Sequence, residues 1–230
     1  MSTVEWRVDV DGDATSAIYQ PALRRQTAVF VCAHGAGGSM RDQGMDRTAD
    51  TMRGVGMGVV RFNFLYRERK SGRPDAMPAL QACVAAVVAR TRRELHPDVL
   101  IIGGRSMGGR AASMLAAEAF PCDGLLLLAY PLHPAGQPEK RRDAHLPAIR
   151  VPVLCINGTR DTLCRRDLMD AAVGTVTAPW TMHWVEGADH SFHVLKSSGR
   201  SDTDVLDEIG ATSAAWLAEL RDRSAAPARA

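Results

Sequence analysis

The 230-residue chain is 46% hydrophobic and 23% charged, and its formal net charge at pH 7 is +2. These values predict one globular domain over residues 1–230, and so small a net charge argues against nucleic acid or an anionic membrane surface as its main partner. We expect no membrane span, because no apolar stretch approaches the roughly 20 residues that cross a bilayer. We also expect no signal peptide, because the start MSTVEWRVDVDGD is polar and acidic and has neither a basic nor an apolar region. The five cysteines, with no Cys-x-x-Cys pair among them, predict free thiols in a reducing cytoplasm.

Short apolar runs alternate with helical stretches along the chain. We expect strands at residues 4–10, 28–33, 59–62, 99–102, 125–129, 153–156 and 182–185. Helices are expected at 78–95, 109–118, about 167–173 and 202–220, with a frayed tail at 222–230. This order predicts an α/β fold, a mostly parallel sheet between two layers of helices, in which sites form at the carboxyl ends of the strands.

The strand at 99–102 runs directly into GRSMG at 104–108, and an alanine-rich helix follows. A strand that turns at once into a helix forces its corner residue, Ser106, into a strained backbone conformation and lifts the side chain clear of the sheet. Glycines two positions before and after are expected because strand and helix nearly touch there. The alternative is a glycine-rich turn with an incidental serine. A phosphate-binding loop is excluded because the motif has no lysine.

The strand at 28–33 ends in HGAGG at 34–38. This pattern predicts an oxyanion-binding loop in which the N–H of Ala36 acts together with the N–H of Met107, the residue after the serine. A simple glycine turn is the alternative. We expect His34 to brace this loop rather than to transfer protons, and we count it among the residues that line the substrate site.

An orienting carboxylate and a base are sought after the next strands, in the order Ser, Asp, His. Asp161 follows the strand at 153–156, and Asp167 is its competitor, although it resembles a residue at a helix N-terminus. His190 follows the strand at 182–185 in the sequence GADH, so we prefer it as base over His193. Four strand ends thus supply a nucleophile, a base, a carboxylate and oxyanion donors.

The chain resembles the α/β-hydrolases, and more narrowly the dienelactone-hydrolase-like branch with the KANL3/Tex30-type proteins. The resemblance is carried by HGAGGSM (34–40), RFNFLYRERKSGRPD (61–75), GGRSMGGRAA (103–112), YPLHPAGQPEKRRDAHL (130–146), VPVLCINGTRDTLC (151–164) and VEGADHSFHV (185–194). It implies a compact hydrolase with little or no cap domain. It also implies that Ser106, Asp161 and His190 match the catalytic positions of the family, some of whose relatives are adaptor-like.

These observations predict a serine hydrolase that cleaves a carboxylic ester, thioester or lactone through an acyl-enzyme, with no cofactor or metal. The expected partner is a small-molecule ester, and the expected state is a cytoplasmic monomer or homodimer. The alternative is a non-catalytic binding or scaffold protein on a hydrolase fold, and hydrolysis of an amide also stays open.

The substrate signals are two clusters of side chains. Cationic residues crowd the loop at 67–73, and Arg105 precedes the nucleophile, which suggests an acidic or phosphorylated ester. The preferred interpretation is a solvated loop balanced by acidic neighbours, with Arg105 making structural hydrogen bonds. Tyr130 and His133 are expected to line the pocket, beside a short proline-rich segment (131–150) at the usual cap position.

Overall fold

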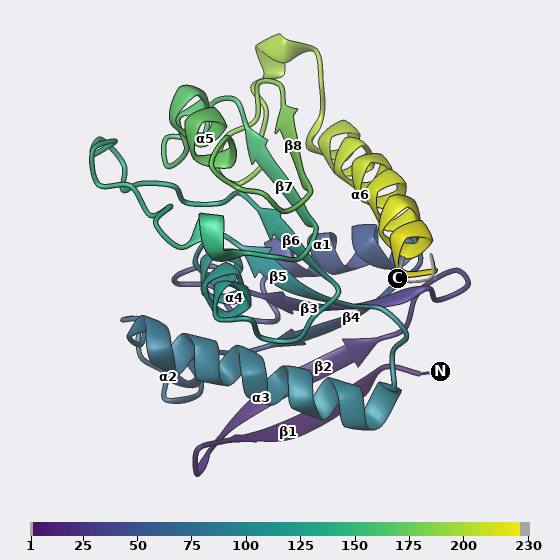
Figure 1. Ribbon diagram of the computed structural model, residues 1–230. Helices are drawn as coiled ribbons and strands as arrows, with labels where there is room; N and C mark the ends of the chain where they lie inside the picture. Colours follow the sequence, from purple (N-terminus) through teal and green to yellow (C-terminus); the bar gives the residue numbers. More distant parts are fainter. Residues whose placement is uncertain (1, 226–230) are drawn as a thin grey trace.

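The computed structural model describes residues 2–225 of the chain. Eight strands form one sheet in the order β1-β2-β4-β3-β5-β6-β7-β8 (Figure 1). The strands are β1 (Val4–Val10), β2 (Asp13–Gln20), β3 (Ala28–Ala33), β4 (Met57–Phe62), β5 (Leu100–Arg105), β6 (Gly124–Leu128), β7 (Val153–Gly158) and β8 (Trp180–Val185). The pairs β1–β2 and β2–β4 are antiparallel and all the others are parallel, so the predicted mostly parallel sheet is confirmed.

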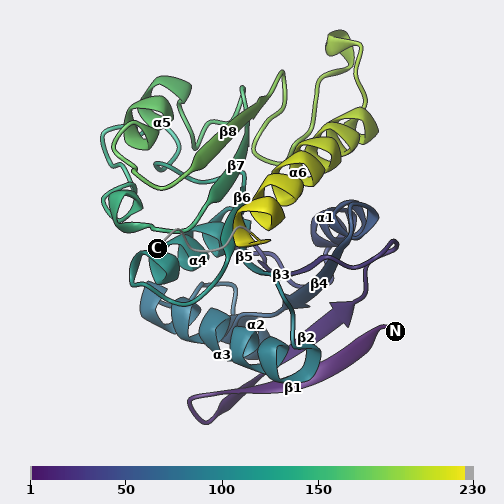
Figure 2. The ribbon, with the colours of Figure 1, turned by 45° about the vertical axis from the view of Figure 1, so that its right-hand side comes forward.

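Helices cover both faces of the sheet, which gives three layers (Figure 2). They are α1 (Gln43–Gly54), α2 (Leu65–Glu68), α3 (Met77–Leu95), α4 (Met107–Ala117), α5 (Arg166–Val173) and α6 (Asp202–Ala225), with 3-10 turns η1 (Leu146–Ala148) and η2 (Lys196–Ser198). One core lies under α1 and α6, and the other lies under α3, α4 and α5. Alternate side chains of β3 enter the two cores, because successive residues of a strand point to opposite faces.

Strand β2, helix α1, the short helix α2 and the two 3-10 turns were not predicted. β2 pairs with β1 through a tight turn in which Asp11 and Gly12 both have positive φ, 53° and 89°. Helix α1 begins after Asp42, whose carboxylate accepts a hydrogen bond from the backbone N–H of Met45. The predicted fraying of 222–230 is wrong for 222–225, because these residues belong to α6, while 226–230 lie outside the described residues.

Two further features bear on the predictions. Each of the five cysteines is free. None of the helices within residues 2–225 combines the length and the hydrophobicity needed to cross a bilayer.

The strand order places a crevice at one point of the sheet. From β3 the chain crosses through α1 to β4 on one side of β3, and from β4 it returns through α3 to β5 on the other side. Where the direction of winding reverses, the loops beyond the two strands diverge and leave a crevice at their carboxyl ends. The residues that follow β3 and β5 therefore face the same space.

Candidate active site

Ser106 occupies the sharp corner between β5 and α4. Its backbone has φ 48° and ψ −117°, a conformation that costs a residue with a side chain about 1–3 kcal/mol. Two backbone hydrogen bonds hold the corner: Ser106 N–H donates to the carbonyl of Leu128 at 2.9 Å, and Arg110 N–H donates to the carbonyl of Ser106 at 3.0 Å. The strained corner that the motif predicts is present.

Gly104 and Gly108 flank the corner for a reason that differs in part from the predicted one. A Cβ at Gly104 would lie 2.1 Å from the carbonyl oxygen of Ala33, and one at Gly108 would lie 2.6 Å from the same residue. Contacts this short do not occur between real atoms, so both positions exclude every larger residue. The close neighbour is thus β3, the adjacent strand, rather than the strand and helix of the corner itself.

The side chains of Ser106, His190 and Asp161 form one continuous chain of hydrogen bonds. His190 Nε2 lies 2.9 Å from Ser106 Oγ, and His190 Nδ1 lies 2.8 Å from Asp161 Oδ2. A carboxylate only accepts, so Nδ1 carries the proton and Nε2 is free to accept from the serine hydroxyl. The Asp161 side chain is fully buried, while 28% of the His190 side chain is exposed. The structure brings together the three residues that the sequence order selects.

Asn157, at the end of β7, fixes the carboxylate and was not assigned a role from the sequence. Its Nδ2 donates to Asp161 Oδ2 at 3.2 Å and to the carbonyl of Tyr130 at 3.1 Å, and its Oδ1 accepts from Tyr130 N–H. The other carboxylate oxygen of Asp161 accepts from Leu163 N–H at 2.8 Å. A polar side chain at the end of a continuously buried strand is the signal that points to Asn157.

The loop after β3 leaves the Ala36 amide unused. Gly38 N–H closes a turn on the carbonyl of Gly35 at 3.1 Å, and Gly37 adopts φ 73°. Within residues 2–225, neither Ala36 N–H nor Met107 N–H, the first of α4, has a hydrogen-bond acceptor. Gly35 packs against the elbow, since a Cβ there would lie 3.4 Å from Ser106 Cβ. Both predicted oxyanion donors therefore lie beside the nucleophile with free amides.

His34 does not line the site. Its ring is fully buried, its Nδ1 lies 2.7 Å from the carbonyl of Gly35, and its Nε2 accepts from Phe64 N–H at 3.2 Å. Burial lowers the pKa of His34, so the ring is neutral. The expectation of substrate contact is wrong, and the bracing role of His34 is what the geometry supports.

Tyr130 and His133 are likewise buried and line neither pocket at the nucleophile, which corrects the prediction. Tyr130 Oη donates to the carbonyl of Arg142 at 2.8 Å. His133 Nε2 accepts from Arg165 N–H at 3.1 Å, and its Nδ1 lies 2.9 Å from the carbonyl of Pro134. Both side chains fold beneath the segment that follows β6 and tie it down, because their polar atoms find backbone partners there.

The two competing residues pair with other side chains, Asp167 with Arg165 and His193 with Asp202. In the cationic loop, Arg69 pairs with both Asp75 and Asp13, and the other cationic side chains of residues 67–73 form no ion pair among the described residues. Residues 67–73 line neither of the pockets beside Ser106. The interpretation as a solvated loop is therefore favoured over anion binding by that loop, while the expected balance by acidic neighbours is seen for Arg69 alone.

Two cavities meet at Ser106, Ala36 and Leu163. The first, the His190 lobe, has a volume of about 570 Å³ and is also lined by Arg105, Asp42 and Ser191. The second, the α4 lobe, has a volume of about 460 Å³ and is also lined by Met107, Arg110, Arg142 and several apolar side chains. Volumes of this size suit small ligands.

Arg105 faces the His190 lobe as predicted, but it makes none of the structural hydrogen bonds expected for it among the described residues. Its guanidinium lies 5.3 Å from the ring centre of Phe192. Burial lowers the pKa of Arg105, and the charges of Asp42 and Asp189 oppose that shift. The guanidinium stays charged at neutral pH regardless, since arginine does not deprotonate in proteins.

Comparisons with known proteins identify a family whose model matches this chain and solved structures with a similar fold. The model of a family described as alpha/beta hydrolase domain matches residues 26–218. A serine hydrolase homologue from Coxiella burnetii is 18% identical, with a TM-score of 0.73 over 92% of this chain and 96% of that one. A serine hydrolase without a lid from Xanthomonas campestris is 22% identical (TM-score 0.72, 100% and 97% covered). A dienelactone hydrolase from Anabaena variabilis is 16% identical (TM-score 0.71, 95% and 99% covered). These three share the fold of this chain.

Proposed function

The chain belongs to the alpha/beta hydrolase domain family, and we propose that it is a serine hydrolase that cleaves carboxylic esters through an acyl-enzyme. The single observation that carries this proposal is the hydrogen-bonded chain Ser106–His190–Asp161. Its members come from three strand ends far apart in the sequence. A fold that needed these residues only for packing would have no reason to align a hydroxyl, an imidazole and a buried carboxylate in this order.

The proposed reaction has two halves. Ser106 Oγ attacks the ester carbonyl while His190 Nε2 takes the hydroxyl proton, and Asp161 holds the ring and stabilises its positive charge. His190 then gives that proton to the leaving alcohol, which departs. A water molecule attacks the acyl-enzyme with His190 again as the base, so that the carboxylic acid is released and the serine is regenerated. None of these steps requires a metal or an organic cofactor.

The negative charge that develops on the carbonyl oxygen is assigned to the free amides of Ala36 and Met107. The N-terminus of α4 adds the positive end of its helix dipole at the same place. Removal of one such donor typically raises the barrier by about 3–4 kcal/mol. Because these donors are backbone groups, they are held in position before the substrate arrives.

An ester is the proposed bond, and a thioester or a lactone fits the same machinery. The segment between β6 and β7, at the usual cap position, is a projecting loop whose one regular element is the turn η1, and it forms no separate domain (Figure 1). An open site suits small or exposed acyl groups. Within the family, we place the chain with the KANL3/Tex30-type proteins on the six segments quoted above.

The test is cleavage of p-nitrophenyl butyrate by wild type and by two serine variants. Ser106→Ala is expected to lose activity to the background level. Ser39→Ala is the matched control, because Ser39 lies on the loop after β3 and lines neither pocket. Cleavage of short-chain thioesters and lactones by the same three proteins identifies the bond that is preferred. No cleavage by wild type would favour the alternative, a binding protein on a hydrolase fold, and full activity in Ser106→Ala would contradict the role of Ser106 as nucleophile.

A further inference from the structure

The two lobes beside Ser106 have different roles if the proposed chemistry holds. The leaving group must come within reach of His190 Nε2 to be protonated, and only the His190 lobe is lined by His190. The α4 lobe is instead lined by Met107, whose amide is one of the proposed oxyanion donors. The acyl part of the substrate is therefore directed into the α4 lobe.

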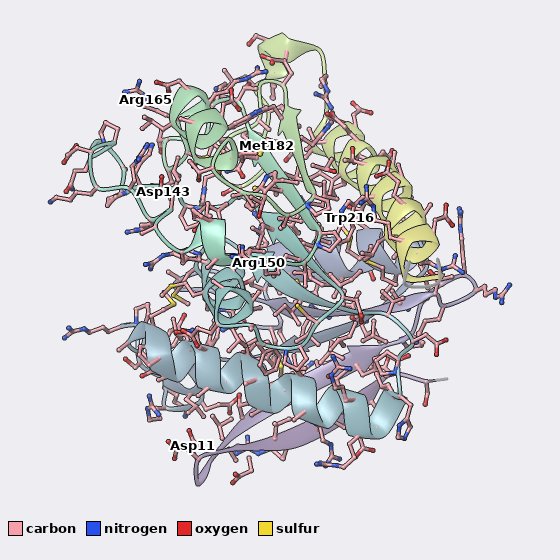
Figure 3. The ribbon with its side chains drawn as sticks, in the orientation of Figure 1. Asp11, Asp143, Arg150, Arg165, Met182 and Trp216 are labelled. Carbon is pink, nitrogen blue, oxygen red and sulfur yellow. The ribbon has the colours of Figure 1, made fainter. Side chains whose placement is uncertain are left out.

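The walls of the α4 lobe are largely apolar, and two guanidinium groups and one carboxylate interrupt them. Met77 and Leu80 come from α3, and Pro131 and Leu163 come from the segments after β6 and β7. The charged members are Arg110 on α4, Arg142 on the segment after β6 (next to Asp143, which Figure 3 labels) and Asp75 just before α3. An apolar wall with charged groups is the form of a site that takes an apolar stem carrying a charge.

Arg110 is fixed close to the nucleophile. It lies one helical turn after Ser106, and its backbone N–H donates to the carbonyl of Ser106 at 3.0 Å. Residues four apart lie on the same face of a helix. The side chain of Arg110 is half-buried, and its Nε is buried with no hydrogen-bond partner. A buried donor without an acceptor is costly, so this atom calls for a partner that the protein does not provide.

The two cations are also not neutralised. Among residues 2–225, neither Arg110 nor Arg142 forms an ion pair with a carboxylate. Of the acidic residues nearby, Asp75 is paired with Arg69 at 2.5 Å, and Asp143 is paired with Arg141 at 3.2 Å. Burial lowers the pKa of Arg110, and the like charge of Arg142 lowers it further. Two guanidinium groups that repel each other in a partly buried wall form an attractive place for an anion.

We propose that Arg110 and Arg142 bind an anionic group, a carboxylate or a phosphate, on the acyl part of the substrate. The preferred substrate is then an ester whose acid portion carries its own negative charge, such as a half-ester of a dicarboxylic acid. This inference rests on the proposed function. Arg105 is the weaker candidate for this role, because the His190 lobe that it faces contains the carboxylate of Asp42, which forms no ion pair among residues 2–225, whereas the Asp75 carboxylate in the α4 lobe is already paired with Arg69.

Three p-nitrophenyl esters test the proposal, with acyl chains of one length that end in a carboxylate, a phosphate or a primary amide. Wild type is expected to cleave at least one anionic ester with kcat/KM about tenfold to a hundredfold above that of the amide, the usual range for hydrogen bonds to a charged group. Whichever anionic ester is preferred identifies the source of the charge. In Arg110→Gln and Arg142→Gln this preference is expected to fall towards unity.

Arg93→Gln is the matched control, because Arg93 is an exposed arginine of α3 that does not line the lobe. It is expected to keep the preference of wild type. Equal rates on all three esters in wild type, or an unchanged preference in both Arg110→Gln and Arg142→Gln, would overturn the proposal.

A binding measurement separates this proposal from the hydrolase itself. Calorimetry on Ser106→Ala compares adipate with its neutral diamide, adipamide, and adds inorganic phosphate as a third probe. We expect adipate or phosphate to bind at least about tenfold tighter than adipamide, and the difference to vanish in the double variant with Arg110→Gln. If no ester is cleaved while this binding persists, the hydrolase function fails and the anion site stands. If esters are cleaved and no anion binds, the hydrolase function stands and the anion site fails.

Discussion

Asn157 Nδ2 lies 3.2 Å from Asp161 Oδ2, the same carboxylate oxygen that faces His190. Both side chains are buried, so water does not compete for this hydrogen bond. Asn157 also spans the backbone of Tyr130, where it accepts from the N–H and donates to the carbonyl. One amide thus ties the end of β7, the carboxylate and the end of β6 into a single arrangement.

The first prediction concerns that amide. Asn157→Ala removes one hydrogen bond to the carboxylate, so we expect kcat on p-nitrophenyl butyrate to fall about tenfold to a hundredfold, the equivalent of about 1.5–3 kcal/mol. KM is expected to change little, because Asn157 lines neither pocket. Urea denaturation is expected to show a loss of unfolding free energy as well, because the buried Tyr130 N–H loses its partner and the Tyr130 carbonyl keeps only the hydrogen bond from Leu132 N–H. An unchanged kcat in a folded variant would show that the contact does not position Asp161.

The second prediction separates two aspartates. Asp161→Asn presents an amide to His190 Nδ1 and favours the wrong tautomer of the ring, so kcat is expected to fall about a thousandfold or more. Asp167→Asn is the matched control, because Asp167 is exposed in the first turn of α5 and pairs with Arg165. Steady-state kinetics of the two variants distinguish them. If Asp167→Asn were the inactive one, the assignment of the carboxylate would be wrong.

The third prediction concerns the elbow. Gly108→Ala brings a Cβ to 2.6 Å from the backbone of Ala33 in the adjacent strand. Neither backbone can move away without a large cost in free energy, so we expect a loss of several kcal/mol of unfolding free energy or failure to fold. Denaturation measures the loss of unfolding free energy, and the soluble yield reports failure to fold. Gly54→Ala, near the end of α1, has no atom within 4 Å of the new Cβ and is expected to be neutral or slightly stabilising. Equal stability of the two variants would contradict the packing argument.

The fourth prediction follows from His145, whose Nε2 lies 2.8 Å from Ser113 Oγ. Burial, together with the nearby cation of Arg110, lowers the pKa of His145 to about 4. The unfolded chain therefore binds a proton near pH 6.5 that the folded chain does not bind until about pH 4. Stability attributable to this group is complete above pH 6.5 and is lost as the pH falls towards 4.

Because the ring is partly exposed, the expected loss is on the order of 1–2 kcal/mol. The measurement is the difference in unfolding free energy between neutral pH and about pH 5, in wild type and in His145→Gln. The variant is expected to show the smaller difference. The same pH dependence in both proteins would remove His145 as the cause.

Much of the fold could be predicted because its central strands β3, β4, β6 and β7 are buried on both faces. Every residue of β3 is buried, and such a run has few interpretations. Strand β2 was missed because its buried and part-exposed positions are mixed, although the Asp11-Gly12 pair before it is a typical hairpin signal. The order of Ser106, Asp161 and His190 along the chain sufficed to select the three residues that the fold brings together.

The direction of a side chain near a strand end could not be predicted in the same way. Tyr130 and His133 follow β6 and were expected in the pocket, yet both are buried under the segment to which they belong. Their orientation depends on partners far away in the sequence, such as Asn157 for the Tyr130 backbone and Arg165 for the His133 ring. The approach of Arg142 to Arg110 also depends on how the segment after β6 folds back over α4.

The central claim is that Ser106 is a nucleophile activated by His190. Intact-mass and peptide mass spectrometry after treatment with a fluorophosphonate probe tests it most directly. We predict one adduct per chain, on the peptide that contains Ser106, and a labelling rate at least about a hundredfold lower in His190→Ala. An adduct on another residue, or labelling of Ser106 that is equally fast without the imidazole, would contradict the account.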